Sequence, residues 1–176
     1  MSAEQFFNQY KENLYGGINT CCLGRIERFD SSIMQADITI LPSNDLIMNV
    51  PVHTPQTSEF IIRMPFKVGD LGFVVFAQNE IDSTMYGIEE QSARQMAVDD
   101  AIFIGGIHLF SDVMPPGHEN DLIIAKKDIS TKIVLTEDGD ILLEPARDLI
   151  INAPGNIAFN GGTVTANGED LTEDLT

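Results

Sequence analysis

Hydrophobic triplets recur every eight residues toward the C-terminal end of the chain. Read from position 133, the octads are IVLTEDGD, ILLEPARD, LIINAPGN and IAFNGGTV. Each octad opens on an apolar triplet, and the first three continue with polar, Gly or Pro residues. Triplets rich in Ile, Leu and Val are typical of strands, whereas pairs such as Asp138-Gly139 and Pro154-Gly155 favour turns. A fixed short period predicts stacked units, each with one short strand and one corner.

A unit of eight residues is too small to enclose a core within one chain. A single short strand also leaves its backbone N–H and C=O groups without partners, which is costly in a core. Three identical chains wrapped about one axis close a prism in which every strand is paired. The repeat therefore predicts an intertwined homotrimeric β-helix or β-prism rod over residues 122–166.

The predicted rod contains two sets of triplet side chains that face opposite ways, because side chains alternate along a strand. The first set is Ile133, Leu135, Ile141, Leu143, Leu149, Ile151, Ile157 and Phe159. The second set is Val134, Leu142, Ile150 and Ala158. Either set can form the inside of the rod.

A different pattern covers residues 18–107 and predicts a small β-barrel. Strand-like segments lie at 20–30, 33–41, 46–54, 60–78 and 99–107. Gly24 is expected to form a bulge, and Val68-Gly69-Asp70 a turn before the strongest apolar run, Leu71–Phe76. Five or six short strands joined by turns within about 100 residues are typical of a barrel. The predicted fold class is all-β.

The remaining segments are predicted to connect these two parts or to flank them. Residues 1–17 form an N-terminal docking segment with a short helix over 3–15, because Phe6, Tyr10 and Leu14 share one helical face. Residues 108–121 include Pro115-Pro116-Gly117 and are predicted to be a linker. Residues 167–176 are acidic and form a tip segment.

Composition narrows the environment and the partners. The 43% apolar fraction supports a folded core, and no apolar run approaches the roughly 18 residues that span a bilayer. The first residues lack a basic start and an apolar run, so we expect synthesis and folding in a cytoplasm. The formal charge of −17 argues against nucleic acid or an anionic membrane as an equilibrium partner.

The sequence offers no pattern typical of a catalytic, metal or cofactor site. His53, His108 and His118 have no metal-ligand spacing, and nucleotide-binding and hydrolase motifs are absent. The adjacent Cys21 and Cys22 are interpreted as reduced, small apolar residues of a strand. The carboxylates of the octads are interpreted as solvated corner residues: Glu137, Asp138, Asp140, Glu144 and Asp148. We therefore expect no enzyme activity, no metal and no cofactor.

An ordered set of segments resembles the central baseplate spike proteins of contractile-tailed bacteriophages. The segments are CLGRIERFD, ADITI, VPV, KVGDLGFVVF and DDAIFIGGI, followed by the octads. The resemblance implies an OB-fold barrel over 18–107 and a trimeric spike after it. It also implies a virion protein at the centre of the tail baseplate, which docks on a trimeric hub. Sheath contraction would then push the needle through the host outer membrane.

The two ends of the chain carry the predicted contacts with other proteins. Phe6, Phe7 and Tyr10 are expected to dock on the hub. Many spikes of this family end in a His-x-His pair that binds a metal ion at the apex, but no His follows His118 here. Either the tip is blunt, or a separate cap protein contacts Asp170, Leu171 and Leu175.

Two other functions remain open at this stage. A type VI-like contractile injection system has a spike of the same architecture. A trimeric tail-fibre or adhesin module that binds surface glycans is the alternative from another class. The last ten residues contain no aromatic side chain, which argues against glycan binding at the tip.

Overall fold

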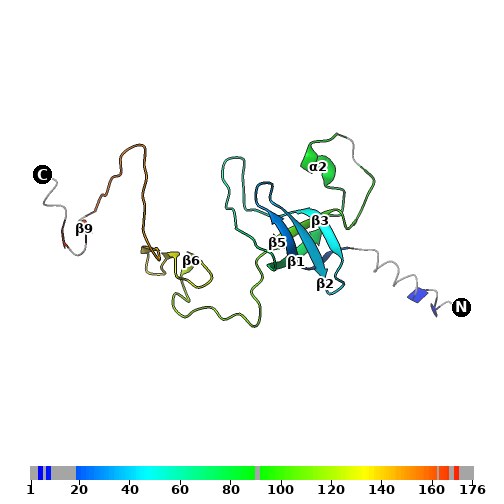
Figure 1. The fold of residues 1–176 in the computed structure, drawn as a ribbon, viewed down its shortest axis with the longest axis horizontal. Coiled ribbons are helices and arrows are strands. Elements are labelled where there is room, and N and C mark those ends of the chain that lie inside the picture. The colour runs from blue at the N-terminus through cyan, green and yellow to red at the C-terminus, as the bar shows by residue number, and fades with distance from the viewer. Residues whose placement is uncertain are drawn as a thin grey trace. The chain divides into compact units, whose positions relative to one another are not determined.

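The computed structural model describes residues 4, 5, 7, 8, 19–89, 92–161, 163–166, 169 and 170. The chain divides into two compact units, Met1–Ser111 and Asp112–Thr176 (Figure 1). The first unit contains β1 (Cys21–Asp30), β2 (Gln35–Leu41), β3 (Leu46–Pro51), β4 (Leu71–Phe76), α2 (Asp82–Tyr86) and β5 (Ala101–Gly105). The second contains β6 (Leu122–Ala125), β7 (Lys132–Leu135), β8 (Ile141–Glu144), β9 (Thr165–Ala166) and β10 (Glu169–Asp170). Residues 4, 5, 7 and 8 are helical, and the rest of the helix predicted over 3–15 lies outside the described residues.

The first unit is built on an antiparallel sheet with the strand order β3-β2-β1-β4-β5. The sheet curls, because the residues just after β3 reach the opposite edge strand. Val52 forms a parallel bridge with Phe103 of β5, and the His53 N–H donates a 2.8 Å hydrogen bond to the Phe103 carbonyl oxygen. The prediction of a mostly β fold is confirmed, in the form of a curled half-barrel sheet.

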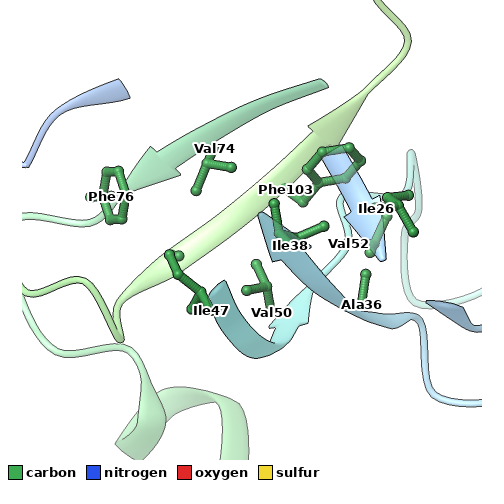
Figure 2. Close-up of a cluster of buried hydrophobic side chains, with 10 residues drawn as sticks. Ile26, Ala36, Ile38, Ile47, Val50, Val52, Val74, Phe76 and Phe103 are labelled. Atoms are coloured by element: carbon green, nitrogen blue, oxygen red, sulfur yellow. The ribbon is translucent and has the colours of Figure 1, made fainter. Parts of the chain in front are cut away.

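The inner face of this curled sheet holds the hydrophobic core (Figure 2). Alternation along the strands directs every second side chain inward. Ile26, Val74 and Phe103 are completely buried. The Phe66 ring, from the β3–β4 connection, packs edge-to-face on Phe103 and on Phe29, with centroid distances of 6.0 and 5.8 Å. The core cluster consists of Ile26, Ala36, Ile38, Ile47, Val50, Val52, Val74, Phe76, Ala101 and Phe103.

The prediction of a bulge at Gly24 is wrong, because Gly24 pairs in regular register with Ile40 of β2 and Gly72 of β4. The register of β1 with β2 shifts further along, between Ile26 and Arg28. Gly24 instead makes room for core side chains. A Cβ atom there would lie 2.5 Å from methyl groups of both Ile38 and Val74.

The β4–β5 connection contains α2 and an ion-pair cluster, neither of which the sequence patterns predicted. The Asp100 carboxylate is fully buried and accepts hydrogen bonds from Arg94 Nε at 2.9 Å and Nη2 at 2.6 Å. It also accepts a 3.1 Å bond from the Ile81 N–H, while Arg94 Nη2 reaches Asp82 at 2.9 Å. The hydrogen bonds from Arg94, with the bond from Ile81, hold the pKa of Asp100 below its ordinary value.

The lowered pKa of Asp100 predicts a loss of stability in acid. A depressed carboxyl pKa contributes stability above the unfolded value, about 3.9, and loses it as pH falls through the folded value. Urea unfolding between pH 6 and pH 2 should therefore show a steeper decline for the wild type than for Asp100→Asn. The Arg94→Gln variant removes the same pair from its other side and should flatten the decline similarly. Parallel pH profiles for all three proteins would contradict this role of Asp100.

The second unit contains an antiparallel sheet with the order β6-β7-β8 and the short pair β9-β10. The predicted triplets at 133–135 and 141–143 form β7 and β8. The triplets at 149–151 and 157–159 are exposed and are not strands. Strands need hydrogen-bonding neighbours, and the single chain places none beside these two triplets.

Candidate assembly surface

One face of the β6-β7-β8 sheet is lined only by apolar side chains. Leu122, Leu135 and Ile141 are paired across the three strands, and so are Ile124, Ile133 and Leu143. Side chains at alternate positions of a strand lie on the same side of the sheet, so these six form one surface. We call these six residues the apolar face.

All six side chains of the apolar face are exposed, with relative accessibilities between 41% and 69%. Part of the surface is hollowed into a groove of about 420 Å³, whose lining includes Ile124, Ile133, Leu143, Pro145 and Leu149. Monomeric soluble proteins rarely expose large contiguous apolar patches, and such patches mark interaction sites. The apolar face is therefore a candidate assembly surface.

The opposite face of the same sheet has a different character. Val134 is completely buried there, and Leu142 is half-buried. Lys132 Nζ and Glu144 Oε2 form a 2.6 Å ion pair across β7 and β8, and this hydrogen bond lowers the pKa of Glu144. In β7 and β8, the first and third triplet residues are thus the exposed ones, whereas the central residues are already partly or fully covered within one chain.

The later part of the predicted rod is exposed on both sets of positions. Its predicted interior residues Leu149, Ile151, Ile157 and Phe159 are all exposed. Ile150, of the second set, is exposed as well. The single chain therefore distinguishes the two sets only in the first two octads.

Two residues of the apolar face were not among those predicted for the rod. Leu122 and Ile124 lie eleven and nine positions before Ile133, so the octad spacing does not reach them. The local signal was present, because Leu122-Ile123-Ile124 is itself an apolar triplet. Its pairing with β7 is what places it beside the octads.

The segment that leads into this sheet is held by a pair of residues without a predicted role. His118 Nδ1 lies 2.7 Å from Asp121 Oδ2, and Asp121 Oδ1 accepts a 2.9 Å hydrogen bond from the Glu137 N–H. These contacts, His118 first, lower the pKa of Asp121. The pair attaches the predicted linker to the turn that follows β7.

The residues predicted to contact a hub or a cap are not brought together with the apolar face by any described contact. Phe7 is exposed in a helical position, while Phe6 and Tyr10 lie outside the described residues. Asp170 pairs with Thr165 in the β9-β10 hairpin. Leu171 and Leu175 lie outside the described residues.

Metal and membrane features were also sought in the described part of the chain. It contains no group of three or more His, Cys, Asp or Glu side chains arranged to hold a metal ion. No helix among the described residues combines the length and apolar character needed to cross a bilayer.

Comparison with known proteins gives one match. Residues 25–106 match a family described as Phage protein Gp138 N-terminal domain, whereas no curated protein matches the chain. The matched segment begins within β1 and ends just after β5, so it covers nearly all of the curled sheet. The resemblance to phage proteins is thus supported at the level of this domain. Through its first unit, the chain is similar to a phage protein domain, which indicates a phage structural protein.

Proposed function

We propose that the chain is the central spike of a contractile phage tail baseplate. In this proposal it is a non-enzymatic homotrimer in the virion, assembled in the host cytoplasm, which docks on the tail hub and pierces the host outer membrane. The observation that carries the proposal is the apolar face of the second unit. A surface lined by six exposed aliphatic side chains fits a subunit whose core is completed by other copies of itself.

The energy available from covering the apolar face is large for such a small sheet. Fully burying one Leu or Ile side chain contributes about 1.5–3 kcal/mol, so covering a half-exposed one contributes about 1 kcal/mol. Six residues then contribute about 6 kcal/mol per chain, which is comparable to the whole stability of a small domain. This gain favours an assembly in which the apolar faces of the copies meet.

Three copies are favoured over two by the octads that follow the sheet. Two packed sheets could cover the apolar faces of residues 122–144 as a sandwich. However, the exposed triplets at 149–151 and 157–159 would still lack hydrogen-bonding neighbours. Three chains around one axis supply them, as a rod with closed rotational symmetry.

The first unit supports the proposal through its topology. The order β3-β2-β1-β4-β5, with a parallel bridge from Val52 to Phe103, is compatible with a partly open OB-fold barrel. Together with the match to a phage protein domain, it fits a collar that joins the rod to a trimeric hub. Phe6, Phe7 and Tyr10 are the proposed hub contact, and Asp170, Leu171 and Leu175 the proposed cap contact.

Solution mass tests the proposal directly. Light scattering of the full chain should give about three times 19.4 kDa, and the complex should survive moderate SDS because its chains are interlocked. A mass of one chain, with cooperative melting, would remove the proposal. A mass of two chains would retain assembly through the apolar face but overturn the trimeric needle.

A further inference from the structure

The β3–β4 connection carries an exposed apolar loop with a defined conformation. The Thr57 N–H donates to the Phe60 carbonyl oxygen at 2.8 Å, the Ile62 N–H donates to the Pro55 carbonyl oxygen at 2.9 Å, and Gln56 bridges Ile61. We call residues 55–64 the hairpin loop; the connection that contains it is drawn as a long loop in Figure 1. Its apolar residues have accessibilities of 48% to 74%: Phe60, Ile61, Ile62 and Met64.

The hairpin loop is anchored at its base and carries positive charge. Phe66 packs on Phe29 and Phe103 in the barrel, and the Lys67 N–H donates a 2.7 Å bond to Asp70 Oδ2. The side chains of Arg63 and Lys67 are exposed, and neither forms an ion pair with any residue that the structure describes. Two cations beside an apolar tip are unusual in a chain with 27 acidic and 10 basic residues.

A second apolar surface lies on the outer face of the same barrel. Leu23, Phe73 and Ile104 are paired across β1, β4 and β5, with accessibilities of 40% to 46%. The next row consists of Cys21, Val75 and Ile102. We call these six residues the sheet patch.

The other half of the outer face is polar, which makes the sheet patch distinctive. Arg28 on β1 donates to Asp37 on β2 at 2.7 Å and to Asn49 on β3 at 3.1 Å. The outer face is thus divided into a hydrated half over β2 and β3 and an apolar half over β4 and β5. A surface divided in this way fits a contact made in one direction only.

We propose that the hairpin loop of one copy docks on the sheet patch of the neighbouring copy. The proposal rests on the proposed trimer, because the rod keeps three barrels tethered at high effective concentration. The loop and the patch are different surfaces of one unit, so their contact is heterologous, and a three-fold repeat closes it into a ring. A second copy is also the occupant favoured by charge, since it presents an excess of acid to Arg63 and Lys67.

Disulfide trapping in the full chain tests this contact. Cys21 is exposed within the sheet patch, and Phe60 is exposed at the loop tip, so Phe60→Cys leaves the core intact. A disulfide forms only when the two Cα atoms come within about 4–7 Å. Diamide, which accepts the two hydrogens, should then link the chains into dimers and trimers that survive boiling in SDS without reductant.

Three controls make the result specific. Phe60→Cys combined with Cys21→Ser should lose the linked species, and so should the wild type and Met85→Cys, which places the thiol on exposed α2. A trimer by light scattering without linked chains, or with a disulfide inside one chain only, overturns the loop contact and leaves the proposed function standing. A monomer by light scattering overturns both.

Discussion

Replacing Ile133 with Glu is expected to convert the three-chain assembly into single chains. Ile133 lies at the middle of the apolar face, paired with Ile124 and Leu143. Three carboxylates would meet in the interior of the rod, where each costs several kcal/mol to bury and each repels the others. Because about 1.4 kcal/mol corresponds to a tenfold change in affinity, assembly should weaken by at least roughly a thousandfold.

Light scattering of Ile133→Glu should therefore give a mass near 19.4 kDa. The matched control is Ile150→Glu, the same change at an exposed residue of the other triplet set. Its mass should stay at three chains, because that set is expected to face away from the axis. If both variants stay trimeric, the apolar face is not the assembly surface.

Truncation of Phe103 should cause the largest loss of stability in the first unit. Its ring is completely buried and packs on Phe66. It also lies against Gly72, where a Cβ atom would come within 2.5 Å of the ring. Phe103→Ala should lower the free energy of unfolding by about 4 kcal/mol, because it leaves a cavity that the surrounding sheet cannot close.

Urea unfolding followed by circular dichroism measures this loss. Phe110→Ala is the matched control, since Phe110 is fully exposed just beyond the sheet. Its unfolding curve should lie within about 0.5 kcal/mol of the wild type. A loss below about 1 kcal/mol for Phe103→Ala would mean that the core is more adaptable than its packing indicates.

The strands of the first unit could be predicted because their alternation is strong and local. Segments 20–30, 33–41 and 46–54 contain β1, β2 and β3, and the run Leu71–Phe76 is β4 itself. The role of Gly24 could not be predicted, because it depends on side chains from two other strands. The cluster around Arg94 was missed for the same reason: its partners come from both sides of α2.

The candidate assembly surface was predictable in part. The octads identified Ile133, Leu135, Ile141 and Leu143 as one set, because alternation is a property of each strand alone. Which set is exposed could not be predicted, since both sets are apolar. The difference depends on the coverage of Val134 and on the Lys132–Glu144 pair, which exist only once the strands are in register.

The antiparallel sheet of the second unit has β6 and β8 as its outer strands, and this has a consequence for biogenesis. Until partners arrive, these strands have unpaired outer edges beside an apolar surface, a combination that promotes aggregation. The first unit precedes this sheet along the chain, so it leaves the ribosome earlier and can fold without partners. The sticky segment is then made late and attached to a folded, highly acidic domain whose repulsion discourages disordered clumping. The yield of assembled protein should accordingly depend on the rate of synthesis, with slow expression favouring ordered association over inclusion bodies.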